Sequence, residues 1–171
     1  SCDGKHIAEV GIGGGLLGVV LLSGTAPKAG KYGNISAAHY SGIDVSGRQR
    51  KSSQDRLSSL FGNDSSRFAI LDASTDLSAL APDIVVSLAT IQSFPSLAYA
   101  DEWLEQVNHC NASRLMLHVL VGNAACCHRN MSFDATLSPR IVQHATTLTT
   151  DYLLQRLTNY NLRWAVSHSN S

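Results

Sequence analysis

Residues 9–15 read EVGIGGG, and this stretch decides how the chain begins to fold. The short apolar run at residues 7–10 predicts a strand, the glycines that follow it predict a tight turn, and the apolar stretch 16–22 predicts a helix. Glycine has no Cβ, so glycines after a buried strand let the backbone turn sharply and approach a ligand closely. The first turn of the following helix carries unsatisfied N–H groups toward that ligand. We therefore expect a ligand-binding turn here, in preference to a glycine-rich turn without a ligand.

The rest of the chain alternates in the same way between short apolar runs and helix-like stretches. Strands are expected at residues 7–10, 40–45, 67–71, 83–88, 114–121 and 161–166, and helices at 16–22, 46–60, 78–80, 96–107 and 149–157. Strands that are apolar almost throughout indicate a parallel sheet covered on both faces. With right-handed crossovers, the fold class is α/β, a doubly wound and mostly parallel sheet in one domain covering residues 1–171.

Composition narrows the classes of function. The 171 residues are 44% hydrophobic and 15% charged, and 13 Lys and Arg balance 13 Asp and Glu. Without a basic excess, we expect neither nucleic acid nor a membrane surface as a partner. Four cysteines are too few for a disulfide scaffold. Residues 10–27 carry no charge, but six glycines between 11 and 24 argue against a membrane helix or a signal peptide, so the expected location is the cytoplasm.

In a doubly wound sheet, ligands bind beyond the carboxyl ends of the strands. Two ligand patterns overlap at the first of these ends. Residues 13–18 match G-x-G-x-x-G, the dinucleotide fingerprint. Residues 9–15 match acidic-x-Gly-x-Gly-x-Gly, which resembles the first motif of the class I S-adenosylmethionine-dependent methyltransferases.

The later strand ends favour the methyltransferase resemblance. Residues 40–46 and 67–74 look like the second and third motifs of that family, each an apolar strand that ends in an acidic residue. Residues 82–95 are similar to the fourth motif, with Asp83 before an apolar strand and Phe94-Pro95 after a short apolar helix. Dinucleotide dehydrogenases do not share this last segment as a unit. The strand at 114–121 fits the fifth strand of the methyltransferase fold.

The resemblance implies a Rossmann-like methyltransferase fold, S-adenosyl-L-methionine as cofactor and a transferase that moves its methyl group by in-line displacement. It implies that Asp44 receives the ribose hydroxyls, that Asp72 faces the adenine amino group and that the backbone N–H of Ala73 faces a ring nitrogen. The expected cofactor-binding residues are Glu9, Gly11, Gly13, Gly15, Asp44, Val45, Asp72, Ala73, Ser87 and Leu88. The acceptor is expected to be a small molecule, with residues 123–144 lining its side of the site.

The sequence departs from the family pattern in three places. Residues 23–39 are expected to form a long loop before the second strand. We expect this loop to lie at the amino ends of the strands and away from the ligand. The N-terminal helix that often covers the cofactor is missing. The terminal antiparallel hairpin is reduced to one strand at 161–166, so the fold is expected to be short at both ends.

No residue is singled out as catalytic. Methyl transfer from a sulfonium depends on positioning, and a base is needed only if the nucleophile keeps its proton. His118, within an apolar strand, is expected in the core or at its rim, whereas His128 is the better candidate for a base. Cys126, Cys127 and His128 lack the spacing of a zinc site, so no metal is expected. The alternatives left open are an NAD(P)-dependent oxidoreductase and a non-catalytic binding protein of the same fold.

Overall fold

A computed structural model describes residues 2–24, 36–119, 121, 125–131 and 142–161. The elements follow one another along the chain as β1 His6–Val10, α1 Leu16–Ser23, β2 His39–Asp44, α2 Gly47–Phe61, β3 Phe68–Asp72, α3 Leu77–Leu80, β4 Ile84–Leu88, the 3₁₀ turn η1 Ile91–Ser93, α4 Leu97–His109, β5 Arg114–His118, β6 Cys126–Met131, β7 Val142–Thr147 and α5 Thr150–Arg156. The expected alternation of strands and helices is confirmed through β5 and again at α5.

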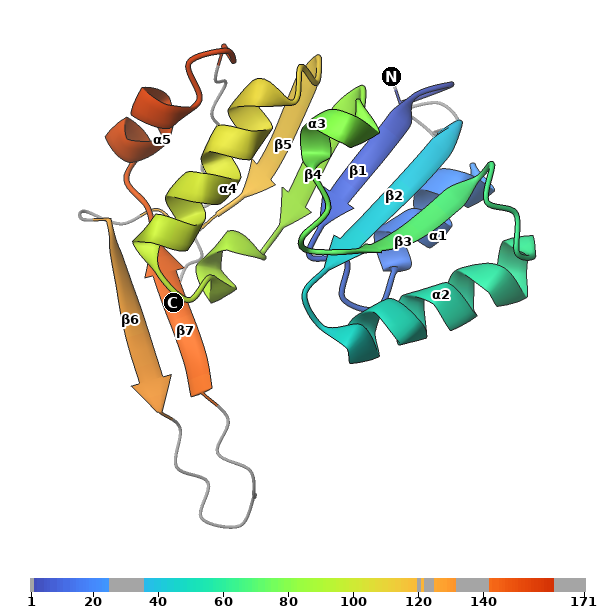
Figure 1. The fold of residues 1–171 in the computed structure, drawn as a ribbon, viewed down its shortest axis with the longest axis horizontal. Coiled ribbons are helices and arrows are strands. Elements are labelled where there is room, and N and C mark those ends of the chain that lie inside the picture. The colour runs from blue at the N-terminus through green and yellow to red at the C-terminus, as the bar shows by residue number, and fades with distance from the viewer. Residues whose placement is uncertain (1, 25–35, 120, 122–124, 132–141, 162–171) are drawn as a thin grey trace, which may run out of the picture.

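The main sheet has five parallel strands in the order β3-β2-β1-β4-β5 (Figure 1). The chain winds outward from β1 to β3, then crosses back to β4 on the other side of β1. The predicted doubly wound parallel sheet is therefore confirmed. The strand order reverses between β1 and β4, and ligands of such sheets bind beyond the carboxyl ends near this point.

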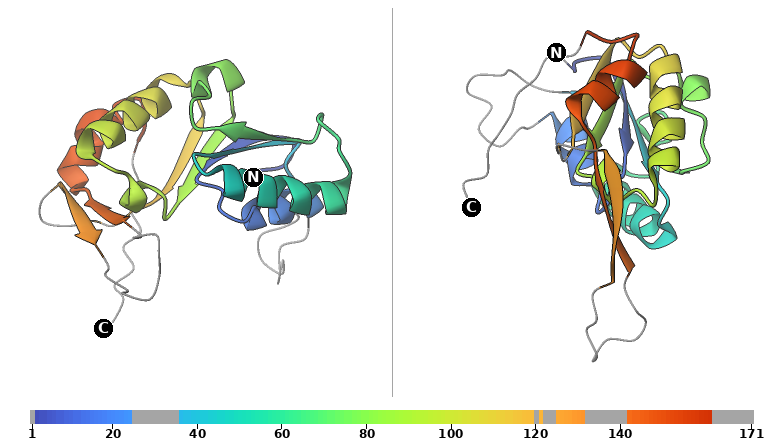
Figure 2. Two further views of the ribbon diagram at one scale, coloured as in Figure 1. Left: turned by 60° about the horizontal axis from the view of Figure 1, so that its bottom comes forward. Right: turned by 90° about the vertical axis from the view of Figure 1, so that its left-hand side faces the viewer.

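Alternating side chains of the strands build a hydrophobic core on each face of the sheet. In β1, Ile7 packs into the core that contains Leu21 of α1 and Leu57 of α2. Its neighbour Ala8 belongs to the opposite core, with Leu77 of α3 and Leu104 of α4. Figure 2 shows α1 and α4 on opposite sides of the sheet. Strands buried on both faces explain the near-continuous apolar runs in the sequence.

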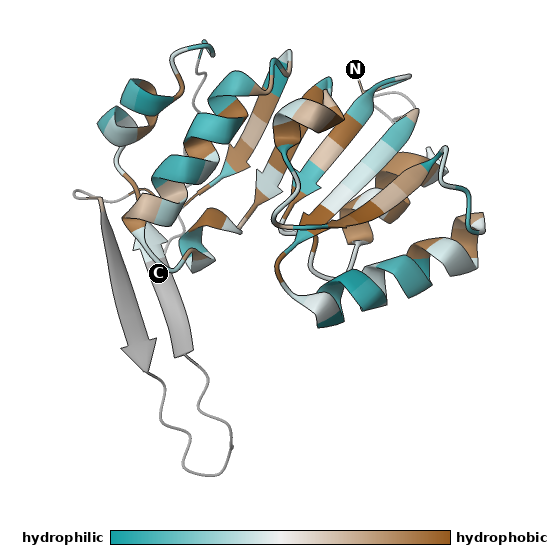
Figure 3. Cartoon of the chain, viewed as in Figure 1, coloured by the Kyte–Doolittle hydropathy of each residue, from teal (hydrophilic) through white to brown (hydrophobic). Residues whose placement is uncertain are grey.

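Helix α2 is hydrophilic along much of its length, as the teal segments of its ribbon in Figure 3 show. Ser46 caps its first turn by accepting from the Gln49 N–H at 3.4 Å, and the chain leaves the helix at Gly62 with φ of 72°. Only Ser53 and Leu57 are buried. The polar sequence therefore places one narrow face of α2 on the sheet and leaves the rest exposed.

The segment after β5 contains two strands that the sequence did not predict. Residues 123–144 were expected to line the acceptor side of the site, which stays a prediction, and β6 and β7 pair as an antiparallel hairpin, with Cys126 opposite Thr147. The hairpin extends past the carboxyl edge of the main sheet in Figures 1 and 2. These strands were not predicted because their sequences are polar and show no alternation of apolar and polar residues. For β6 and most of β7 the structure describes the backbone alone, so the side chains of Cys126, Cys127 and His128 lie outside the described part.

Two further expectations about the last strands have different outcomes. The strand expected at 114–121 ends at His118, which was expected in the core or at its rim and is exposed, on the same face of β5 as the exposed Arg114 and Met116. The strand expected at 161–166 lies outside the described residues. Among the described helices, none has the length and apolar character needed to cross a bilayer.

The long loop after α1 joins the sheet where we expected. Residues 25–35 lie outside the described part, but the end of the loop is held at the amino side of β1. Ser36 O accepts from the Gly4 N–H at 3.0 Å, and the Ala38 N–H donates to Lys5 O at 3.0 Å. The loop from α1 therefore joins β2 at the amino edge of the sheet, opposite the glycine turn.

Candidate functional site

The glycine turn lies at the point where the strand order reverses. Gly11 follows β1 with φ of 80°, and a Cβ at this position would lie 2.0 Å from Thr90 Oγ1. The Thr90 hydroxyl in turn donates to Val10 O at 3.1 Å, which ties the end of β1 to the segment after β4. Only glycine permits both this backbone conformation and this close approach.

Hydrogen bonds hold the turn against β2. The Gly11 N–H donates to Ile43 O at 2.8 Å, and the Gly15 N–H donates to Ile12 O at 2.9 Å. The Gly13 N–H donates to the Asp44 Oδ2 atom at 3.1 Å. Three of the N–H groups in the glycine turn are thus engaged inside the protein, so they do not point at a ligand.

Side chains of α2 hold the same turn from the other side. The Ser53 hydroxyl donates to Gly13 O at 2.8 Å, and Arg56 Nη1 donates to Gly14 O at 2.6 Å. Sequence analysis missed both residues, because it predicted a helix at residues 46–60 without assigning a role to its side chains. The spacing of Arg50, Ser53 and Arg56, three residues apart, was the available signal, since residues three apart share a helix face.

Asp44 and Asp72 end neighbouring strands and are direct register partners. Asp44 Oδ1 accepts from the Ser46 N–H at 2.8 Å, in addition to the bond from Gly13. Asp72 accepts from the Ser74 N–H at 3.0 Å and forms an ion pair with Arg50 at 2.8 Å. The bonds from Ser74 and then the charge of Arg50 hold the pKa of Asp72 below its usual value. Since a carboxylate can accept about four hydrogen bonds, each of the two carboxylates can accept more.

Glu9 lies beneath this edge in the interior of the sheet. It is only 5% exposed, and Tyr40 Oη donates to its Oε2 atom at 2.5 Å. Burial raises the pKa of Glu9 to about 7, the bond from Tyr40 opposes the increase, and the charge of Asp44 adds to it. The sequence placed Glu9 among the ligand-binding residues, whereas in the structure its described partner is Tyr40.

The remaining predicted residues surround the carboxyl edge. Val45, 77% exposed, and Leu88, 43% exposed, place apolar side chains on this edge directly after Asp44 and at the end of β4. Ala73 is half-buried beside Asp72. The Ser87 hydroxyl is fully buried and has no hydrogen-bond partner among the described residues.

Two shallow hollows in the surface lie away from this edge. One, of about 420 Å³, is lined by Asn108, Ala112 and Tyr160 among others, at the amino side of the sheet. The other, of about 340 Å³, lies over the outer face of α4 near Glu105. Neither includes a residue of the glycine turn or of the two carboxylates.

Solved structures share this architecture. A SAM-dependent methyltransferase from Methanosarcina mazei is similar over 92% of this chain and 79% of its own, with a TM-score of 0.57 and 14% identity. The N-terminal domain of EvdMO1 with SAH bound is similar over 92% of this chain and 64% of its own, with a TM-score of 0.55 and 12% identity. No protein-family model and no curated protein matches the sequence.

The chain has the Rossmann-like fold of the S-adenosylmethionine-dependent methyltransferases.

This methyltransferase fold does not by itself decide the reaction. The cyclase SpnF is similar over 91% of this chain, with a TM-score of 0.54 and 15% identity, and the chain spans only 50% of its length. Function therefore has to be argued from the residues at the carboxyl edge.

Proposed function

We propose that this protein binds S-adenosyl-L-methionine at the carboxyl edge of its sheet and transfers the methyl group to a small-molecule acceptor. One observation carries the proposal. The bond from the Gly13 N–H to Asp44 joins the glycine turn to the end of β2, and Asp72 stands next to Asp44 at the end of β3. The glycines of the turn, which have no side chains, and the carboxylates of Asp44 and Asp72 therefore lie in one region of the surface, where a single adenosine-containing ligand could contact all of them.

The residues at this edge fit the adenosine half of the cofactor. Asp44 retains the capacity to accept bonds from two ribose hydroxyls, and Asp72 can accept from the adenine amino group. The exposed Val45 side chain offers an apolar surface for the flat base, and the Ala73 N–H is the proposed donor to a ring nitrogen. Gly11, Gly13 and Gly15 leave room for the amino acid half, with Ser87 and Leu88 at the end of β4.

The bound cofactor supplies a methyl group that its sulfonium charge already activates. The protein has to orient that group and the acceptor in line. This positioning can lower the activation free energy by several kcal/mol without a dedicated base. The carboxylates of Asp44 and Asp72 at the edge favour a cationic ligand over an anionic one.

The same contacts disfavour the dinucleotide alternative. A pyrophosphate is bound by free N–H groups of the glycine turn and the following helix. Here the Gly13 N–H donates to Asp44, so a carboxylate stands where the phosphate would need a donor. The N–H groups of Gly11 and Gly15 are also occupied.

Thermal unfolding with S-adenosylmethionine, S-adenosylhomocysteine and NADH, side by side, tests the proposal. A ligand at about one hundred times its Kd adds roughly 2.7 kcal/mol of stability, or about 5–10 °C for a chain of this size. We expect this increase in Tm with the two adenosyl compounds and no change with NADH. A response to NADH alone would overturn the proposal, and no response to any of the three would favour the non-catalytic alternative.

Replacing Asp44 tests the assignment of its carboxylate. Asp44→Asn should weaken S-adenosylhomocysteine binding by about 1–3 kcal/mol, as the loss of a charge-assisted hydrogen bond does. Isothermal titration measures the change, with Asp55→Asn on the exposed face of α2 as the matched control. An unchanged Kd in Asp44→Asn would remove Asp44 from the site.

A further inference from the structure

One guanidinium connects the two strand ends that carry the carboxylates. Arg50 Nη1 donates to Asp44 O at 2.7 Å and to Val45 O at 2.9 Å, and the same nitrogen pairs with Asp72 Oδ2 at 2.8 Å. The two contacts with backbone carbonyls are hydrogen bonds, and the contact with Asp72 is an ion pair. Arg50 therefore contacts the backbone after β2 and the side chain after β3 at once.

The position of Arg50 is itself well determined. It lies in the first turn of α2, and its N–H donates to Ser46 O at 2.9 Å. Only Val45 and Ser46 separate β2 from α2, so the helix start moves together with the strand end. The Arg50 side chain is 27% exposed, and its guanidinium lies against the backbone at the end of β2.

Without a cation between them, Asp44 and Asp72 would repel each other. Neighbouring strands lie about 4.8 Å apart, and the two carboxylates extend from paired positions on β2 and β3. The guanidinium offsets this repulsion and also fixes the direction of the Asp72 carboxylate. A lysine would supply the charge but not the planar arrangement of donors.

We propose that Arg50 is a positioning residue, which holds Asp44 and Asp72 so that both carboxylates face the same adenosyl ligand. The proposal rests on the function proposed above and adds a residue that does not itself touch the ligand. Its prediction is specific: loss of Arg50 weakens binding through Asp72, not through the stability of the fold.

The test is a double-mutant cycle on ligand affinity. The Kd of S-adenosylhomocysteine and of adenosine is measured for the wild type, Arg50→Met, Asp72→Asn and the double variant. Arg50→Met should weaken both ligands about tenfold, because both contain the adenosine half, and the double variant should be no weaker than Asp72→Asn alone, since contacting residues are not additive.

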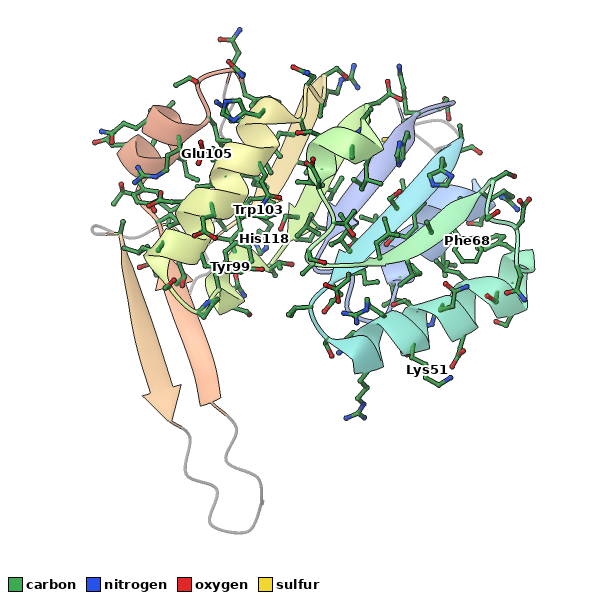
Figure 4. The ribbon with its side chains drawn as sticks, viewed as in Figure 1. Lys51, Phe68, Tyr99, Trp103, Glu105 and His118 are labelled. Atoms are coloured by element: carbon green, nitrogen blue, oxygen red, sulfur yellow. The ribbon has the colours of Figure 1, made fainter. Side chains whose placement is uncertain are left out.

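Two further variants separate positioning from general damage. Arg50→Lys should restore part of the affinity, to within about threefold of the wild type. Lys51→Met is the matched control, because Lys51 is adjacent in α2, is 78% exposed and points away from the sheet in Figure 4. It should bind both ligands as the wild type does. Circular dichroism and Tm confirm that each variant is folded.

The outcomes distinguish the two proposals. If the wild type binds the ligands but Arg50→Met binds them equally well, the role of Arg50 is refuted and the proposed function stands. Fully additive losses in the double variant also refute it, because Arg50 would then not act through Asp72. If the wild type binds neither ligand, the proposed function fails and the role of Arg50 fails with it.

Discussion

Glu9 and Tyr40 show how one glycine makes room for a buried polar pair. The Tyr40 ring lies against α1 at Gly18, where an added Cβ would come within 2.7 Å of it. Because Gly18 has no side chain, the fully buried tyrosine can extend beneath the helix and donate to Glu9. A carboxyl group that is buried in this way prefers its neutral form, which explains its raised pKa.

The raised pKa of Glu9 predicts a particular pH dependence of stability. The carboxyl has a pKa of about 7 in the folded protein and 4.5 as its ordinary value. Between these two values the folded state holds a proton that the unfolded state has lost, so the free energy of unfolding falls as pH rises, by up to about 3 kcal/mol. Glu9→Gln cannot titrate and should lose this decrease.

Urea unfolding of the wild type and Glu9→Gln at pH 5 and pH 8 measures the effect. His6 contributes the opposite trend, because burial and then the charge of His39 lower its pKa, which costs stability as pH falls below its ordinary value. This contribution is the same in both proteins and cancels in their difference. Equal pH dependence in the two proteins would mean that Glu9 titrates normally.

At the scale of elements, α5 depends on α4 for its stability. Its seven residues are too few for a stable isolated helix. Asp101 of α4 accepts from Tyr152 Oη at 2.6 Å and pairs with Arg156 Nε. The Arg156 guanidinium also stacks on the Tyr152 ring at 3.5 Å. Together with the buried Leu153, these contacts dock α5 on α4.

Asp101→Ala should therefore release α5 locally. The loss of a hydrogen bond and a half-exposed ion pair predicts a decrease of about 1 kcal/mol in the free energy of unfolding. Hydrogen exchange should become faster in α5 while the strands of the main sheet keep their protection. Asp55→Ala, which removes the exposed pair with Lys51, is the control and should change neither measurement. Uniformly faster exchange would argue against a local role.

At the scale of the whole molecule, the β6–β7 hairpin is anchored at the carboxyl edge of the main sheet. The buried Thr146 hydroxyl donates to Phe94 O at 2.8 Å, just after η1. The next residue but one, Leu148, is fully buried in the core beneath α4 and forms a parallel bridge with Val121. The hairpin base is thus continuous with the body of the protein at the carboxyl edge (Figure 1).

Thr146→Val tests this anchor with little change in volume. Loss of the buried hydrogen bond should lower the free energy of unfolding by about 1 kcal/mol and accelerate hydrogen exchange in β6 and β7. Thr146→Ser keeps the hydroxyl and should preserve the slow exchange of the hairpin. If Thr146→Val exchanges as slowly as Thr146→Ser, the hydroxyl does not anchor the hairpin.

The sequence by itself determined the elements whose signals are local. The apolar runs predicted five of the strands, and the glycines at 11–15 predicted the turn after β1, because burial on both faces and backbone conformation depend on residue type alone. The acidic residues at the ends of β2 and β3 were singled out because residues 40–46 and 67–74 resemble the second and third methyltransferase motifs. The strand order is then restricted by the handedness of the crossovers.

Only the tertiary structure decided how distant residues meet. It showed that Glu9 is sequestered by Tyr40, that Arg50 joins Asp44 to Asp72, and that the polar segment after β5 pairs as a hairpin. The spacing of Arg50, Ser53 and Arg56 indicates a shared helix face, but no local signal identifies the partners in any of these three cases. Each depends on the partner that another part of the chain supplies: a tyrosine 31 residues away, an ion pair between a helix and the next strand, and a strand bonded to a second polar strand.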